Sequence, residues 1–287
     1  MIKTRKGDII VTNENQNKLL KKLYGNTLGR VLLKTLTAPC ISRTAGKFMD
    51  SRASKLLIKP FIKRSGIDTS QYIMCDFRSY NDFFTRRVKQ GKRPIDFEAD
   101  HLISPCDSKL TAHKISKNSI FRIKGSRYRV SDLLRNDFLA KRFCGGYCLI
   151  FRLEVDDYHR YCYIDNGTKT HNTFIAGELH TVNPIALERY NIYKRNSREY
   201  TVLHTENFGD VVQIEVGAMM VGRIVNNHGE ASFRRGEEKG RFEFGGSTIV
   251  MLFGKDSISI DEDILRNSAE GIETMVKMGE KIGRAGK

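Results

Sequence analysis

Hydrophobic residues recur along the chain with two different periods. Over residues 16–65, aliphatic residues stand three or four positions apart among lysines and arginines, which predicts amphipathic helices with breaks near Gly25, Gly29, Pro39 and Pro60. From residue 101 onward, short runs of Ile, Val, Tyr and Phe alternate with Gly, Asn and Asp, a pattern typical of strands and turns. We therefore expect an α+β protein in which N-terminal amphipathic helices precede a strand-rich domain of packed antiparallel sheets.

Individual elements can be placed within this outline. Residues 1–15 are expected to be irregular or hairpin-like, and residues 89–100 to form a polar linker. Further helices are expected at 80–88, capped by Ser79 or Asn81, and at 128–136 and 138–143. A β-hairpin that closes a sandwich is expected at 276–283. The remaining predicted strands are residues 110–115, 148–153, 160–164, 201–205, 211–216, 219–224 and 248–253.

Length and charge divide the chain unevenly. Its 287 residues suit one compact catalytic unit, residues 67–287, preceded by a basic helical extension, residues 1–66. The extension holds 15 Lys and Arg against 3 Asp and Glu, so it supplies +12 of the net charge of +16. The basic surface is therefore concentrated at the amino-terminal end.

The basic helices have several possible partners. An anionic membrane is favoured because cations alternate with aliphatic and aromatic residues such as Leu56, Leu57 and Phe61, and such helices lie in the headgroup plane with their apolar stripe inserted. Packing of the apolar face onto the catalytic unit is an equally ordinary interpretation. A nucleic acid would also attract the charge, but the interleaved pattern disfavours it.

Targeting signals and cysteines set the expected location. No run approaches the roughly 20 apolar residues of a membrane span, and the first residues lead into a polar segment rather than a signal-peptide core. Six cysteines are scattered without a Cys-x-x-Cys pair, which predicts reduced thiols and no zinc site. We expect a peripheral protein on the cytoplasmic side of the cell membrane.

The segment Phe244-Gly245-Gly246-Ser247-Thr248 carries candidate chemistry. Two glycines allow backbone conformations in which the Ser247 hydroxyl can reach the carbonyl of Gly246. An N-to-O acyl shift would turn that amide into an ester, and elimination would leave a dehydroalanine that hydrolyses to a pyruvoyl group. The same residues are also typical of a plain turn that enters a buried strand.

Several segments, in order, make the chain resemble the phosphatidylserine decarboxylase proenzymes. Besides residues 244–248 they are residues 83–86, 93–96, 104–110, 157–161 and 216–222, and the lead-in at 235–240 is similar to the prokaryotic type II branch. The resemblance implies a pyruvoyl-dependent decarboxylase fold and self-cleavage between Gly246 and Ser247. The products would be a β chain, residues 1–246, and an α chain, residues 247–287.

The resemblance also implies the site residues. Asp107 and His159 are expected to form a charge relay that removes the proton of Ser247. Cys162 stands where the family has a second histidine, so the second role falls to His159 itself, Cys162, His171 or His180. Without the resemblance, Asp107 reads as a turn residue and His159 as a structural histidine.

The implied reaction converts phosphatidylserine to phosphatidylethanolamine. The pyruvoyl group made from Ser247 would form a Schiff base with the substrate amine and accept the electron pair left by carbon dioxide, with His159 as proton donor and no metal. A homodimer is a candidate assembly. The alternatives are a pyruvoyl decarboxylase of a soluble amino acid and a serine hydrolase that uses Asp107, His159 and an intact Ser247.

Overall fold

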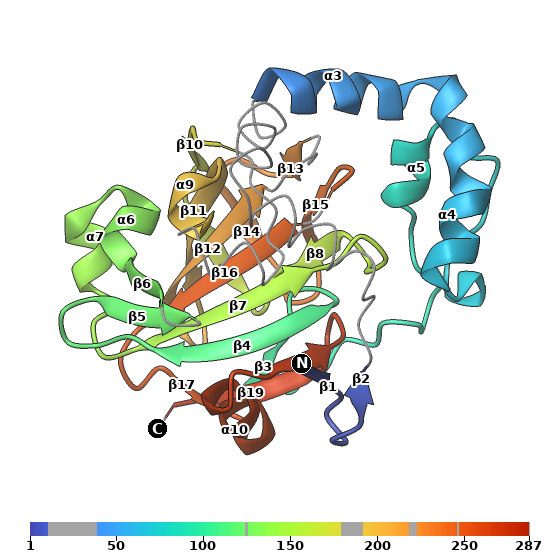
Figure 1. The fold of residues 1–287 in the computed structure, drawn as a ribbon. Coiled ribbons are helices and arrows are strands. Elements are labelled where there is room, and N and C mark those ends of the chain that lie inside the picture. Colours follow the sequence, from blue (N-terminus) through green and yellow to red (C-terminus); the bar gives the residue numbers. More distant parts are fainter. Residues whose placement is uncertain (11–38, 124–125, 179–191, 218–222, 246, 287) are drawn as a thin grey trace.

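One large sheet runs through the centre of the molecule (Figure 1). The structure, a computed structural model, describes residues 1–10, 39–123, 126–178, 192–217, 223–245 and 247–286. The sheet has 11 strands in the order β14-β9-β11-β12-β16-β7-β4-β18-β1-β2, and β10 pairs with β11. Its neighbours are antiparallel except β1 and β18, which run parallel. The strands are β1 (Ile2–Lys3), β2 (Ile9–Ile10), β4 (Ser108–Lys114), β7 (Tyr147–Leu153), β9 (Gly167–Lys169), β10 (Thr173–Ile175), β11 (Arg198–Thr205), β12 (Gly209–Gly217), β14 (Ala231–Phe233), β16 (Ser247–Phe253) and β18 (Glu273–Val276).

Two three-stranded sheets cover one face of the large sheet. Their orders are β13-β15-β8 and β17-β19-β3. Phe151 and Met251 of the large sheet share a core with Tyr161, Phe242 and Ile282 of these smaller sheets. The strands are β3 (His101–Ile103), β8 (Arg160–Cys162), β13 (Ile224–Asn226), β15 (Glu238–Phe242), β17 (Ile258–Ile260) and β19 (Lys281–Ala285).

The opposite face of the large sheet is covered by short helices and a hairpin. Val250 and Leu252 point to this side, where they share a second core with Tyr128, Leu133 and Tyr193. The covering elements are β5 (Ile120–Ile123), β6 (Ser126–Arg129), α6 (Val130–Leu134), α7 (Asp137–Lys141) and α9 (Ile192–Arg195). The expectation of a strand-rich α+β protein is confirmed.

The first helices form a unit beside the sheets (Figure 1). Their aromatic side chains, Phe61 of α4 and Phe83 and Phe84 of α5, meet in a core of their own that also takes in Phe244. In the described part of the chain, no helix has both the length and the apolar character needed to cross a bilayer. The elements of this helical unit are α3 (Pro39–Asp50), η1 (Arg52–Leu57), α4 (Ile58–Ser65), η2 (Thr69–Gln71) and α5 (Tyr80–Phe84).

Several helix predictions need correction, and residues 16–38 lie outside the described residues. Pro60 does not break a helix, because it lies in the first turn of α4, where backbone N–H groups have no intrahelical partner. The helix predicted at 80–88 ends at Phe84, since Val88 forms a β-bridge with Tyr72 instead. Its predicted cap is confirmed: the Ser79 hydroxyl accepts a hydrogen bond from the N–H of Asp82.

The helix predicted at 128–136 is present as α6 over residues 130–134, but it begins later than predicted because Tyr128 and Arg129 pair with β5 as part of β6. The insertion at 138–143 corresponds to α7. Of the predicted strand 219–224, residues 219–222 lie outside the described residues. The other predicted strands are present.

The hairpin predicted at 276–283 is wrong. β18 pairs with β1 and β4 in the large sheet, whereas β19 pairs with β17 and β3, so the turn between them crosses from one sheet to another. Gly283 permits this pairing, since a Cβ there would lie 2.4 Å from the carbonyl oxygen of Ser259 in β17. The helix α10 (Glu262–Ala269) was not expected.

A buried ion pair sits between the large sheet and β15. Lys239 Nζ lies 2.7 Å from Glu215 Oε1, and neither side chain is exposed to solvent. The pairing of β15 with β8 shifts register between Glu238 and Gly240, and this bulge falls at Lys239. A bulge re-aims the side chain of its extra residue, and here the ammonium reaches Glu215 and, at 2.7 Å, Asn226 Oδ1.

Removing only one member of this ion pair should lower the free energy of unfolding far more than replacing both members with apolar residues. Glu215→Leu leaves the Lys239 ammonium buried without its carboxylate, and we expect the free energy of unfolding to fall by about 3–5 kcal/mol. Glu215→Leu combined with Lys239→Met removes both charges and should restore most of that loss. Urea unfolding measures the difference, with both variants made in a Ser247→Ala chain that stays whole. A double variant no more stable than the single one would contradict the pairing.

Candidate active site

The ends of four strands meet at one edge of the large sheet. β16 begins at Ser247, which pairs with Leu153 at the end of β7 and with Gly217 at the end of β12. β4, the next strand beyond β7, pairs Lys109 with Arg152 and begins directly after Asp107. The register therefore brings Asp107 and Ser247 to the same edge, although they are far apart in the sequence.

Ser247 is buried, and its hydroxyl has no hydrogen-bond partner among the residues that the structure describes. Its neighbour on β12 is Gly217, which has no side chain to fill the space beside it. The preceding turn requires a glycine at residue 245, where φ is 133°. Gly246 lies outside the described residues. A buried hydroxyl without a partner is uncommon, and its oxygen is free to react.

His159 lies beside the segment that leads to Ser247. Its carbonyl accepts a hydrogen bond of 2.9 Å from the N–H of Phe242. Its ring packs 4.2 Å from the ring of Phe84, which in turn contacts Phe244 at 5.5 Å between centroids. His159 is thus fixed against both sides of the loop that enters β16.

The imidazole of His159 is held as a neutral base. Nδ1 lies 3.0 Å from the carbonyl oxygen of Asp157, so Nδ1 carries the hydrogen and donates it. Nε2 is then the nitrogen with the free electron pair, and it is buried without a partner. Burial, which disfavours the charged form, lowers the pKa of His159 to about 3. His159 Nε2 is therefore a base, and Ser247 Oγ a hydroxyl, and neither has a hydrogen-bond partner among the described residues.

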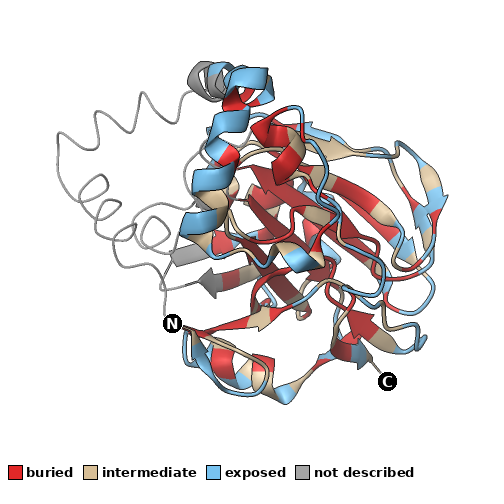
Figure 2. Ribbon diagram, turned by 90° about the vertical axis from the view of Figure 1, so that its right-hand side faces the viewer, coloured by how far each residue is buried: buried red, intermediate tan, exposed pale blue. Residues whose placement is uncertain are grey.

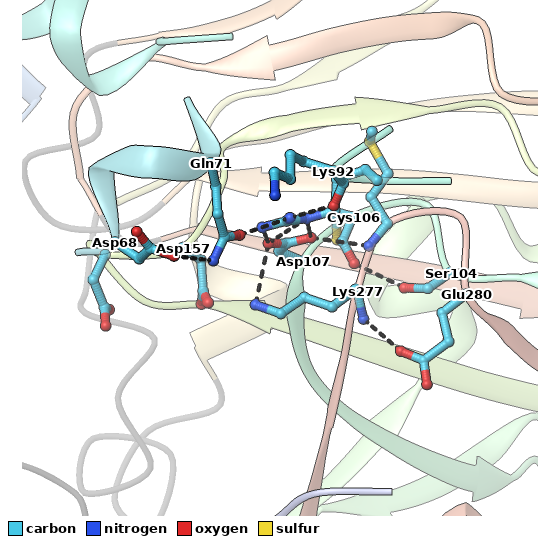
Figure 3. A network of polar contacts seen from close by, with 12 residues as sticks. Asp68, Gln71, Lys92, Ser104, Cys106, Asp107, Asp157, Lys277 and Glu280 are labelled. Carbon is cyan, nitrogen blue, oxygen red and sulfur yellow. Dashed lines mark hydrogen bonds and ion pairs between the residues drawn. The ribbon is translucent and has the colours of Figure 1, made fainter. Parts of the chain in front are cut away.

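Asp107 has other partners than the histidine (Figure 3). Its carboxylate accepts hydrogen bonds from Arg93 Nε at 2.7 Å and Nη2 at 2.6 Å, from Lys277 Nζ at 3.3 Å and from the N–H of Met278 at 2.9 Å. Burial acts to raise the pKa of Asp107, but Arg93 and Lys277 outweigh it and keep the pKa below its usual range. The expected direct hydrogen bond between Asp107 and His159 does not hold in this structure.

The sequence interpretation missed the residues that orient His159. Lys109 Nζ binds the Asp157 carboxylate at 2.6 Å and lies 3.3 Å from the Glu154 carboxylate. The Asp157 carboxylate also accepts a hydrogen bond of 2.7 Å from the backbone N–H of Glu154. This contact fixes the turn whose Asp157 carbonyl holds the imidazole. Lys109 and Asp157 both fall in the segments that carry the family resemblance, but a lysine in a strand gives no sign of being buried.

The other candidates for the second histidine role differ in their surroundings. Burial raises the pKa of the Cys162 thiol to about 12, so the thiol stays protonated and is a poor base near neutral pH. His171 is exposed and lies 3.0 Å from Glu230. His180 is outside the described residues. Among the described histidines only His159 is buried.

Other titratable groups do not form a metal centre or a disulfide in the described part of the chain. No group of three or more His, Cys, Asp or Glu side chains there has the arrangement that could hold a metal ion. The five cysteines that the structure describes are free thiols.

Residues 80–284 match the family model described as phosphatidylserine decarboxylase. The chain belongs to the phosphatidylserine decarboxylase family. A relative named phosphatidylserine decarboxylase proenzyme 2, from Clostridium acetobutylicum, is 49% identical over 277 residues, which cover 96% of this chain and 95% of that protein. Phosphatidylserine decarboxylase proenzymes from Clostridium tetani and Clostridium botulinum are 42% and 41% identical over 272 residues, covering 93% of this chain and 92% of each relative.

Two ion pairs join residues that precede Ser247 to residues that follow it. Lys277 and Glu273 lie after Ser247, whereas their partners Asp107 and Arg152 lie before it. Arg152 binds Glu273 through two bonds, Nε to Oε1 at 2.8 Å and Nη2 to Oε2 at 2.7 Å, and both side chains are buried. These pairs, together with the pairing of β16 with β7 and β12, would hold the two parts together if the chain were cut before Ser247.

Protonation of His159 should destabilise the fold. The unfolded chain takes up a proton near pH 6.5, the ordinary pKa of histidine, whereas the folded chain does so only near pH 3, so the free energy of unfolding rises with pH across this window. Stability is complete above about pH 6.5 and is lost below it by up to about 1.4 kcal/mol per pH unit. Between pH 6.5 and about pH 5, a Ser247→Ala chain should lose about 2 kcal/mol more than the same chain with His159→Gln. Urea unfolding at several pH values tests this, and equal pH dependence would contradict a buried neutral imidazole.

Lys109 should matter for self-cleavage through its hold on the Asp157 turn. Lys109→Met frees that turn and should slow cleavage at Ser247 by about 10²-fold, the cost typical of displacing a catalytic group by about 1 Å. Lys109→Arg keeps the charge and should retain most of the rate. Pulse-chase of freshly translated chains measures the rate.

A matched measurement separates position from folding. The melting temperature of each Lys109 variant is compared in an uncleavable Ser247→Ala chain. If Lys109→Met cleaves at the normal rate, or if Lys109→Arg cleaves as slowly as Lys109→Met with an unchanged melting temperature, the positioning role is wrong.

Proposed function

We propose that this chain is a proenzyme that cuts itself between Gly246 and Ser247 and then decarboxylates phosphatidylserine to phosphatidylethanolamine. One observation carries the proposal: within the described residues, His159 Nε2 and Ser247 Oγ are buried without hydrogen-bond partners, and the backbone of His159 is bonded to Phe242 in the segment that leads to Ser247. Proteins with this family's name, including relatives called proenzymes, match almost the whole chain. The family supplies the substrate, and the two unpartnered atoms supply the chemistry of the first step.

Self-cleavage follows from the state of His159. The neutral Nε2 accepts the hydroxyl proton of Ser247 as the oxygen attacks the carbonyl carbon of Gly246, and the amide becomes an ester. Loss of the Ser247 α-proton then expels the Gly246 carboxylate, and water replaces the resulting imine nitrogen, which leaves as ammonia. The β chain would end at Gly246 and the α chain would begin at former Ser247.

The described residues fit a pyruvoyl group at this position. Ser247 is buried at the start of a strand, its oxygen makes no hydrogen bond that would have to be broken, and Gly217 opposite leaves room for it. When present, the group supplies a ketone that reacts with the substrate amine and accepts the electron pair released with carbon dioxide. His159 is the proposed proton donor to the substrate carbon. Asp107, expected from the sequence to form a charge relay with His159, is proposed here to fix Arg93 and the segment at Lys277 instead.

The helical unit supports a location on the membrane surface. Much of its surface is exposed (Figure 2). Five large apolar side chains of this unit and its connections are exposed: Phe48, Leu56, Leu57, Ile73 and Met74. Lysines stand near several of them in the sequence, at 47, 55, 59 and 63, a composition that suits an anionic leaflet. We therefore propose a peripheral position on the cytoplasmic side of the cell membrane, with 67–287 as the catalytic domain and 1–66 as the membrane-associating region, except that β1 and β2 within 1–10 belong to the large sheet of the catalytic domain. A homodimer remains a candidate assembly, and no nucleic-acid partner is proposed.

Intact mass spectrometry tests the proposal directly. Wild-type protein should give two chains split after Gly246, and the shorter one, residues 247–287, should carry a ketone in place of its amino group. Ser247→Ala and His159→Ala should each remain one chain of 32.8 kDa, because the first lacks the nucleophile and the second the base. A wild-type protein that stays whole while folded would remove the proposed chemistry. Normal cleavage of His159→Ala would reassign only the base.

A further inference from the structure

The amino-terminal hairpin, β1 and β2 with the turn between them, is attached to the last part of the chain (Figure 1). β1 lies between β18 and β2 in the large sheet and runs parallel to β18, with Ile2 opposite Glu273. The carbonyl of Met1 accepts a hydrogen bond of 3.1 Å from the N–H of Glu273, and Ile2 is buried. The first residues therefore pair with a strand that lies after Ser247, on the side of the proposed cut that becomes the α chain.

Arg5, in the turn of this hairpin, binds three acceptors from the same side of the cut. Its Nη2 lies 2.8 Å from Asp261 Oδ2, its Nε donates to Asp263, and its Nη1 donates to the carbonyl oxygen of Lys281 at 2.7 Å. Glu280 lies 3.6 Å from Nη1. A guanidinium suits this arrangement because its N–H groups form a rigid planar fork, which an ammonium lacks. Arg5 thus joins the start of α10 to the start of β19.

These contacts support the turn that binds Asp107. β18 ends and β19 begins on either side of the turn at 277–280, and the hairpin contacts both strands. Within that turn, Lys277 Nζ lies 3.3 Å from the Asp107 carboxylate, and the N–H of Met278 donates to it at 2.9 Å. The hairpin therefore fixes both ends of a turn whose residues reach the candidate active site.

We propose that the amino-terminal hairpin, residues 1–10, is the surface on which the tail of the α chain, residues 261–285, docks in the processed enzyme. This inference rests on the proposed function, because the two segments belong to separate chains only after cleavage at Ser247. Only noncovalent contacts then hold the α chain. β16 is held between β7 and β12, whereas β18 is held between β4 and the short β1. The hairpin covers the outer edge of β18 and keeps the turn at 277–280 on Asp107.

Hydrogen–deuterium exchange of the processed enzyme tests this docking surface, because amide exchange measures the local opening of each segment. Arg5→Gln should raise the exchange rate of residues 273–281 by roughly 10-fold or more, the effect of losing charge-assisted hydrogen bonds, and leave that of β16 unchanged. The matched control is Lys6→Gln, which removes the same charge from the next residue of the hairpin, an exposed one. Arg5→Lys keeps the charge without the planar fork, so its exchange rate should lie between those of the other two variants.

The outcomes separate this inference from the proposed function. Equal exchange of residues 273–281 in Arg5→Gln and Lys6→Gln would overturn the docking surface and leave the decarboxylase reaction standing. An equal rise in β16 would also overturn it, because Arg5 would then stabilise the whole fold rather than the tail. If Arg5→Gln does not fold, Arg5→Lys is compared with Lys6→Gln in the same way. A wild-type protein that stays whole while folded would overturn the proposed function, and this inference with it.

Discussion

The register of β16 against its two neighbours is the constraint on which the site depends. Side chains alternate across a strand, so a slip of one residue would turn Ser247 to the opposite face of the sheet and leave Thr248 in its place. Two buried cores fix the register, because Ile249 and Met251 fill one face while Val250 and Leu252 fill the other. With every residue of β16 buried, either slip would be costly, and the position of the Ser247 hydroxyl follows from packing along the whole strand.

Several buried charges around this edge are held in ion pairs. Lys109 has Asp157, Arg152 has Glu273, and Asp107 has Arg93 and Lys277. An unpaired buried charge would cost several kcal/mol, so these pairs are needed once the side chains are enclosed. Among the described residues, the buried Nε2 of His159 and the hydroxyls of Ser247, Thr248 and Ser108 near this edge have no hydrogen-bond partner. Neutral groups can remain in this state at modest cost, and the first two are the groups that the proposed chemistry needs.

The helical unit and the loop before Ser247 are connected by aromatic packing and hydrogen bonds. Phe244 packs against Tyr80 at 5.1 Å and Phe84 at 5.5 Å between ring centroids, and its N–H is held by Asn81, whose amide also donates to Asp50 of α3. The sequence left two interpretations of the basic helices, docking on a membrane or packing on the catalytic unit. Phe61 packs against Tyr80 in the interior of the protein, whereas Leu56 of the neighbouring η1 is exposed to solvent. The two interpretations therefore apply to different faces of one unit, which connects the proposed membrane surface to the proposed cleavage site.

The sequence by itself determined the α+β class, most strands and the segment around Ser247, because hydrophobic period, turn residues and short family motifs are local properties of a chain. It did not determine which strands pair: residues 276–283 have the pattern of a hairpin, yet β18 and β19 lie in different sheets since each finds a better partner far away in sequence. For the same reason, the sequence did not determine which side chains contact one another in the site. Asp107 and His159 were recognisable singly, but the tertiary structure gave Arg93 to the first and the Asp157 carbonyl to the second. Which polar groups meet in a buried interior depends on strand order and register, and those are decided by packing between distant segments.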